Sequence, residues 1–314
     1  MQSVMGLDTS NYTTSVAIYS ENGALNQSKK LLPVKKGEKG LRQSDAVFHH
    51  VNQIPLVFDD VMSKINCVPS AVGVSSKPRD ENGSYMPCFN VGVSLARVIS
   101  SLLKIPYFEF SHQVGHVTAA SYSAKRLDLL KKEFIAFHVS GGTTEALLVT
   151  PDNESVIKTK IIAKTLDLNA GQLIDRTGVM LGMDFPAGTE LENLAIKYNK
   201  TFNIKPTLKG FDCCLSGVEN MCKKMMLENQ NKEKISRFCI EYIKLTLDKM
   251  CESILNEYGD LPVLFAGGVM SNSIIKKYLQ EKYNAVFGEP KFSSDNAAGI
   301  AVLTAIKSGV LNEY

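Results

Sequence analysis

The most informative segment of this 314-residue chain reads FIAFHVSGGTTEALLV and spans residues 134–149. Apolar runs at 134–139 and 146–149 flank a polar, glycine-containing turn, which predicts a β-hairpin. A similar hairpin is predicted near the N-terminus, where runs at 4–7 and 15–19 flank the turn DTSNYTT. Sliding one hairpin over the other aligns TTS at 13–15 with TTE at 143–145. We interpret this as a duplicated lobe, with one hairpin opening each half of the chain.

Helices and strands are predicted to alternate after each hairpin. In the first half, apolar periodicity indicates helices at 46–64 and 91–103 and strands at 71–75 and 105–110. In the second half it indicates helices at 169–181, 191–197, 216–227, 235–258 and 271–280, and a strand at 262–266. The alternation predicts an α/β fold with a mainly parallel sheet in each lobe. We expect residues 1–131 and 297–314 to form the first lobe and 132–296 the second.

Composition excludes several classes of protein. The chain is 44% hydrophobic and 21% charged, as in ordinary globular proteins. Its net charge of +3 is too small for a polybasic protein, so nucleic acid is allowed rather than indicated. Seven cysteines without a CxxC pair favour neither a disulfide framework nor a thiolate zinc site, and they suit a reducing cytoplasm. Without a basic leader or an apolar run of about 18–20 residues, we expect neither secretion nor a membrane span.

Two glycine motifs are candidates for anion binding. In the turn SGGTT at 140–144, glycine lets backbone N–H groups approach an anion, although a tight hairpin without a ligand is the alternative. The motif AGGVMSN at 266–272 ends an apolar strand and begins a helix. The lack of side chains there would let a flat base or a phosphate reach the helix N-terminus, whereas an ordinary strand-to-helix turn is the alternative.

A histidine pair is the sharpest local signal for a metal. If the segment after Ser111 is helical, His112 and His116 project from one face and can share an ion; the alternative is two structural histidines. The motif lacks the glutamate of HExxH, so it does not support peptide hydrolysis by that route. Two imidazoles leave an ion under-coordinated, which favours a third, oxygen ligand. We expect Asp295, which by itself would be only a helix cap, to supply it.

Two further features have weaker signals. Asp175 follows a helix start rich in small residues, where a carboxylate can accept hydrogen bonds from ribose hydroxyls; a solvated helix aspartate is the alternative. A basic stretch near the N-terminus contacts a phosphate backbone or is simply a solvated face. Its lysines are Lys29, Lys30, Lys35, Lys36 and Lys39.

Taken in order, these motifs resemble those of the threonylcarbamoyladenosine synthase family (TsaD, formerly Gcp) along essentially the whole chain. The resemblance rests on seven collinear segments: GLDTS at 6–10, HQVGH at 112–116, VSGG at 139–142, IDR at 174–176 followed by PAG at 186–188, LSG at 215–217, GGVMSN at 267–272 and SDN at 294–296. Seven motifs in one order are far more specific than any one of them.

The resemblance implies an actin-like, sugar-kinase-like fold of two duplicated RNase H-like lobes with a nucleotide cleft between them. It further implies transfer of threonylcarbamoyl from threonylcarbamoyl-AMP to N6 of the tRNA adenosine beside the anticodon, with TsaB-like and TsaE-like helper proteins. A divalent iron or zinc ion is implied at His112, His116 and Asp295. The adenylate is implied to contact His138, Val139, Ser140, Gly141, Gly142, Asp175, Gly188 and Asn272.

Several positions depart from the family pattern. Asn11, Tyr12 and Thr13 replace Cys-Asp-Glu, Thr143 replaces a histidine, and Gln172 replaces an acidic residue. The polar stretch at 77–87 replaces a Gly-Pro-Gly-Leu loop, and LRQS at 41–44 replaces Val-Val-Pro-Glu. These departures suggest a diverged paralogue. They leave open a non-catalytic nucleotide-binding scaffold in a tRNA-modification complex, and an ATPase or kinase of the same fold is a third alternative.

Overall fold

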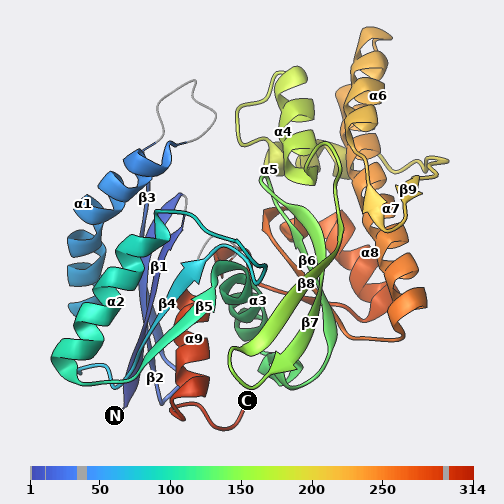
Figure 1. Cartoon of the computed structure of the whole chain (residues 1–314). Helices are drawn as coiled ribbons and strands as arrows, with labels where there is room; N and C mark the ends of the chain where they lie inside the picture. Colours follow the sequence, from blue (N-terminus) through green and yellow to red (C-terminus); the bar gives the residue numbers. More distant parts are fainter. Residues whose placement is uncertain (1, 11, 34–40, 293–296) are drawn as a thin grey trace. The chain divides into compact units, whose positions relative to one another are not determined.

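A computed structural model describes residues 2–10, 12–33, 41–292 and 297–314 of the chain (Figure 1). Contacts divide it into two compact units. The first comprises Met1–Lys132, Thr150–Thr159 and Lys291–Tyr314, and the second Glu133–Val149 and Lys160–Pro290. The expected second lobe includes residues 150–159. In the structure Thr150–Thr159, at the tip of a β-hairpin, belongs to the first unit. In the described ranges, no helix combines the length and apolar character needed to cross a membrane.

The first unit is built on a five-stranded sheet in the order β3-β2-β1-β4-β5. Strand β1 pairs antiparallel with β2 and parallel with β4, which pairs parallel with β5. The strands are β1 (Ser3–Ser10), β2 (Thr13–Ser20), β3 (Leu25–Leu31), β4 (Val72–Lys77) and β5 (Tyr107–Ser111). The helices are α1 (Gln43–Met62), α2 (Phe89–Leu103), α3 (His112–Ser123) and α9 (Ala297–Lys307), with a 3-10 turn at Leu127–Lys131.

Alternation along β1 explains how helices cover both faces of this sheet. Met5 and Leu7 belong to the core that also holds Val57 of α1 and Ala96 of α2. Val4, one residue out of phase, packs in a second cluster with residues of α9. On that face a side chain at Gly6 would collide with the backbone of α9, so the glycine allows the helix to lie directly against the strand.

The second unit repeats the same sheet. Its order is β12-β11-β6-β7-β8, and β6 pairs antiparallel with β7 and parallel with β11, as β1 does with β2 and β4. The strands are β6 (Phe134–Val139), β7 (Thr144–Asp152), β8 (Val156–Lys164), β11 (Val263–Ala266) and β12 (Val286–Phe287), beside a small β9–β10 hairpin (Leu208–Lys209, Asp212–Cys213). The repeated order confirms the predicted duplication.

Five helices accompany the second sheet. They are α4 (Ala170–Met180), α5 (Gly188–Ile196), α6 (Ser216–Leu227), α7 (Lys232–Tyr258) and α8 (Ser273–Tyr283), with 3-10 turns η2 (Gly268–Ser271) and η3 (Pro290–Phe292). A single apolar core joins β6 and β11 to all five helices; Phe137 and Phe265 stack in it with ring centroids 4.7 Å apart. Helix α7 packs against α4, α5, α6 and α8. These contacts hold in place the helices that begin around the candidate site.

Candidate functional site

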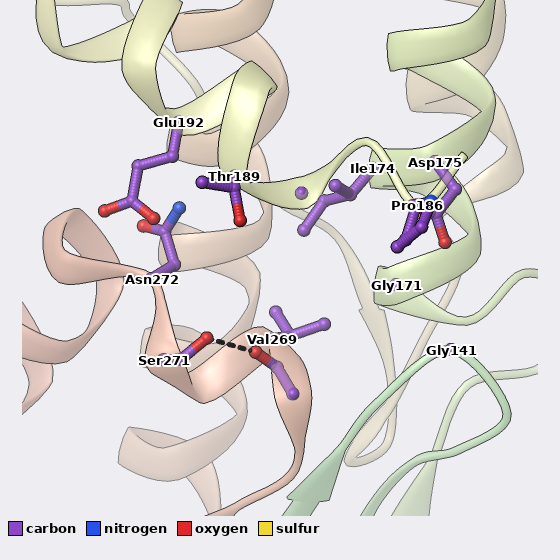
Figure 2. A pocket seen from close by; sticks show the side chains of 12 residues that line it. Gly141, Gly171, Ile174, Asp175, Pro186, Thr189, Glu192, Val269, Ser271 and Asn272 are labelled. Carbon is purple, nitrogen blue, oxygen red and sulfur yellow. Dashed lines mark hydrogen bonds between the residues drawn. The ribbon is translucent and has the colours of Figure 1, made fainter. Parts of the chain in front are cut away.

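A pocket of about 260 Å³ lies within the second unit (Figure 2). It brings together four of the residues predicted to hold an adenylate: Gly141, Asp175, Gly188 and Asn272. These residues come from the β6–β7 turn, α4, the start of α5 and the start of α8. The remaining lining residues are Gly171, Ile174, Pro186, Thr189, Glu192, Gly268, Val269 and Ser271.

The glycine turn that follows β6 is held in a fixed shape. The Ser140 hydroxyl accepts hydrogen bonds from the backbone N–H groups of Gly142 (3.3 Å) and Thr143 (3.1 Å). The Ser140 carbonyl accepts from the N–H of Gly171, at the start of α4 (3.1 Å). A Cβ atom on Gly171 would lie 2.6 Å from the Gly141 nitrogen, so only glycine permits this packing. The turn and α4 therefore form one wall of the pocket.

Asp175 and Gly188 form the wall at the α4–α5 connection. One Asp175 carboxylate oxygen accepts a hydrogen bond from the N–H of Ala187 (2.9 Å), which ties α4 to the residue before α5. Gly188 and Thr189, the first two residues of α5, both line the pocket. A helix N-terminus carries partial positive charge and exposed N–H donors, so this wall suits an anionic group such as a phosphate.

The side chain of Asn272 has two polar groups, an oxygen with a structural role and an amide NH₂ group. Its side-chain oxygen caps α8 by accepting from the N–H groups of Ile274 (3.1 Å) and Ile275 (3.2 Å). Because the oxygen is engaged, a ligand in the pocket would meet the amide NH₂, which is a donor. The residue is only 6% exposed, so the amide is held in place by its surroundings.

Two polar residues of the pocket were missed by the sequence analysis. Thr189 and Glu192 lie on α5, on the same side of the pocket as Asn272 (Figure 2). Glu192 accepts from the backbone N–H of Ser273 (2.7 Å) and also from its hydroxyl, which joins α5 to α8. Glu192 stands four residues after Gly188, a spacing that places both on one helix face and was the available signal.

The other predicted adenylate residues are not among those that line this pocket. His138 and Val139 end β6, where His138 stands opposite Glu145 of β7 and beside Ala266 of β11. Val139 is fully buried, with its carbonyl group packed against Gly267, whose φ of 104° suits glycine. Ser140 and Gly142 lie in the turn on either side of Gly141. These residues therefore shape the turn that lines the pocket.

The histidine pair lies in the first unit, and the segment after Ser111 is helical as expected. His112 begins α3 and His116 follows one turn later, with ring centroids 4.7 Å apart. The Ser111 hydroxyl caps the helix by accepting from the N–H of Val114 (3.3 Å). The spacing and the nitrogen donors fit a divalent iron or zinc ion.

The third expected ligand, Asp295, lies outside the described residues. In the part of the chain that the structure describes, no three His, Cys, Asp or Glu side chains are arranged to hold a metal ion. Lys29 and Lys30 of the basic stretch are exposed on β3, and Lys35, Lys36 and Lys39 also lie outside the described residues.

Asp8 is hydrogen-bonded to the first histidine of the pair. Its Oδ2 atom accepts from His112 Nδ1 (2.9 Å) and from the Ser75 hydroxyl (2.5 Å). Burial by itself would raise the pKa of Asp8, but the charge and hydrogen bond of His112, with the bonds from Ser75 and Ser10, outweigh it and lower this pKa. Burial and the Asp8 charge raise the pKa of the Cys88 thiol to about 11, which makes it a poor metal ligand.

Comparisons with known proteins agree with this architecture. The family model TsaD, tRNA N6-adenosine threonylcarbamoyltransferase, matches residues 28–302. The protein of that name from Thermosipho africanus is 30% identical, with 95% of this chain and 92% of the relative covered. The one from Staphylothermus marinus is 27% identical, with 95% and 89% covered.

Solved structures show the fold. Component A of the (R)-2-hydroxyglutaryl-CoA dehydratase of Acidaminococcus fermentans superposes with a TM-score of 0.57 at 14% identity, covering 99% of this chain and 100% of the other. The ROK hexokinase of Thermus thermophilus gives 0.51 at 12% identity, covering 98% and 99%. The actin-like, sugar-kinase-like fold expected from the sequence is thus confirmed.

Proposed function

Since this chain belongs to the TsaD family of tRNA N6-adenosine threonylcarbamoyltransferases, we propose that it transfers threonylcarbamoyl from threonylcarbamoyl-AMP to N6 of the tRNA adenosine beside the anticodon. The observation that carries the proposal is the pocket of the second unit, where glycine turns and helix N-termini converge with Asp175 and Asn272. A tRNA substrate would place the protein in the cytoplasm. TsaB-like and TsaE-like proteins are the proposed helpers.

The pocket offers a distinct contact to each part of an adenylate. The turn at Gly141 and the N-terminus of α5 at Gly188 supply backbone N–H groups and small residues where a phosphate can approach. Asp175 and Glu192 supply carboxylate oxygens that can accept from ribose hydroxyls. The Asn272 amide is a donor for a ring nitrogen of the base. Held in this way, the departing AMP is positioned before transfer begins.

The transfer itself requires no protein nucleophile. The N6 amine of the tRNA adenosine attacks the carbamoyl carbon of the mixed anhydride, and a new C–N bond forms while the C–O bond to phosphate breaks. AMP leaves with the bonding electron pair, and the amine loses a proton. Holding the phosphate still and stabilising the charge that grows on it are therefore the main tasks of the protein.

A divalent metal at His112, His116 and Asp295 is part of the proposal. The pair on α3 fits such an ion in donor type and spacing. When bound, the ion would supply Lewis-acid chemistry for the transfer.

The decisive experiment combines purified protein, threonylcarbamoyl-AMP, unmodified tRNA and the helper proteins. Digestion of the tRNA followed by liquid chromatography should reveal threonylcarbamoyladenosine, and His112→Ala should abolish the product together with bound iron or zinc. If adenine nucleotide binds while wild-type protein forms no product and holds no metal, the protein is a non-catalytic scaffold instead. Release of ADP and phosphate from ATP would identify an ATPase.

A further inference from the structure

Asp8, Ser75 and His112 meet at one edge of the first sheet. Asp8 and Ser75 lie two residues before the carboxyl ends of β1 and β4, and His112 directly follows β5. These three strands are parallel neighbours in the sheet. In parallel α/β sheets this edge is where ligands bind. Asp8 and His112 are 104 positions apart in sequence, yet the Asp8 carboxylate and the His112 ring are hydrogen-bonded at 2.9 Å.

Both carboxylate oxygens of Asp8 already have donors. Oδ1 accepts from the backbone N–H of Ser10 (2.9 Å), and Oδ2 accepts from the Ser75 hydroxyl and from His112 Nδ1. The carboxylate is 1% exposed. Since Oδ1 accepts from a backbone N–H and Oδ2 from a hydroxyl, the carboxylate serves as the acceptor at this site, and Nδ1 of His112 is assigned as the donor that carries the proton. In the neutral ring, the nitrogen with the lone pair is then Nε2.

We propose that Asp8 is a positioning residue, which fixes the tautomer and orientation of His112 so that Nε2 is the nitrogen presented to the metal. The consequence for metal binding rests on the proposed function, whereas the tautomer itself does not. A carboxylate behind a metal-binding imidazole orients the ring and makes it a better ligand. His116, one turn along α3 and edge-on to the His112 ring, then completes a pair with a preset geometry.

Asp8→Asn is the sharpest substitution, because it changes one oxygen into an NH₂ group with almost no change in shape. The Ser10 N–H requires an acceptor, which keeps the asparagine oxygen at the Oδ1 position. The NH₂ group then faces His112 Nδ1 and donates to it, so the proton of the neutral ring moves to Nε2. That nitrogen can no longer bind a metal without losing its proton.

The test uses the full-length protein, first without metal and at a pH well above the ordinary imidazole pKa. Long-range ¹H–¹⁵N spectra should show the His112 proton on Nδ1 in wild type and on Nε2 in Asp8→Asn. Titration with Zn²⁺ alone should show an affinity about ten- to hundredfold lower in the variant. Thr9→Val is the matched control. Thr9 follows Asp8 in β1 and bonds the Cys88 carbonyl (3.0 Å) and the Gly92 N–H (3.0 Å), without a hydrogen bond to His112.

A general structural role would make Thr9→Val and Asp8→Asn alike, with both destabilised and neither changing the tautomer. Either that result or a wild-type spectrum with the proton on Nε2 overturns the proposal. If the variant does not fold, the wild-type spectrum alone still tests which nitrogen carries the proton. Failure of wild-type protein to bind Zn²⁺ would count against the metal of the proposed function. The tautomer comparison would still decide the role of Asp8.

Discussion

A Cβ atom added to Gly171 would stand 2.6 Å from the backbone nitrogen of Gly141. This contact sets the distance between α4 and the turn that follows β6, and both residues line the pocket. Because the atoms on the other side of the contact are backbone, they cannot swing away as a flexible side chain would.

Gly171→Ala should therefore push the turn away from α4. We expect a loss of about 1–3 kcal/mol in the free energy of unfolding, as in other overpacked sites. We also expect AMP affinity to fall at least tenfold, which equilibrium titration would measure. Gly217→Ala is the matched control, since Gly217 is the second residue of α6 as Gly171 is of α4, and its Cβ would meet open space. If both substitutions lower the free energy of unfolding and the AMP affinity equally, the contact between Gly171 and Gly141 does not determine the shape of the pocket.

The substitution Asp175→Asn removes the carboxylate charge without removing the oxygen that accepts from the backbone. The asparagine oxygen can still accept from the N–H of Ala187, so the unfolding temperature should change little. AMP binding should weaken about tenfold, or about 1.4 kcal/mol, because one ribose acceptor is lost or weakened. Calorimetric titration measures the change. If the affinity for AMP is unchanged, the Asp175 carboxylate does not contribute to AMP binding.

Asn272 permits a similar separation of its two roles. Asn272→Asp keeps an oxygen to cap α8 but has no amide donor, so stability should hold while AMP affinity falls. Asn272→Ala should lose affinity and also about 1 kcal/mol of stability. Chemical denaturation and AMP titration of both variants test this. Full AMP affinity in the aspartate variant would contradict a donor role for the amide.

His50 should make stability depend on pH. It is fully buried on α1, and burial lowers its pKa below the ordinary 6.5, although the Ser10 carbonyl and the Asp8 charge oppose the shift. A group with a lowered pKa contributes stability above its unfolded pKa and loses it as the pH falls. The free energy of unfolding should therefore decrease as the pH drops below about 6.5.

Replacement of His50 by glutamine should flatten this dependence, whereas the same change at the neighbouring His49 should not. Urea denaturation across the pH range provides the measurement. If stability instead rises as the pH falls, His50 is charged in the folded protein and Nδ1 donates to the Thr14 hydroxyl, 2.8 Å away.

The sequence predicted the central strands better than the edge strands. The bounds of β6 came directly from its apolar run at 134–139, because a buried strand is apolar along its length. One edge of the first sheet is β3, whose polar sequence LNQSKKL gives no strand pattern. Within it the sequence indicates only Lys29 and Lys30, as part of a basic stretch. Strand β8 also lies at an edge, where exposed Lys158 and Lys160 alternate with buried residues and break up the apolar run that marks a buried strand.

Local motifs predicted the glycine turn, Asp175 and Asn272 as site residues. The spacing of Glu192 from Gly188 indicates a shared helix face, but the bond from Glu192 to Ser273 depends on how α5 packs beside α8, which sequence spacing alone does not give. The bond between Asp8 and His112 likewise joins residues on β1 and α3 that only the folded sheet brings together.

A crystal structure of the protein soaked with AMP tests the pocket assignment most directly. We predict difference density for one AMP molecule in the pocket of the second unit, with its phosphate near Gly141 and Gly188 and its base beside Asn272. An empty pocket in crystals whose AMP is bound elsewhere would contradict the assignment, and with it the proposed transfer from an adenylate.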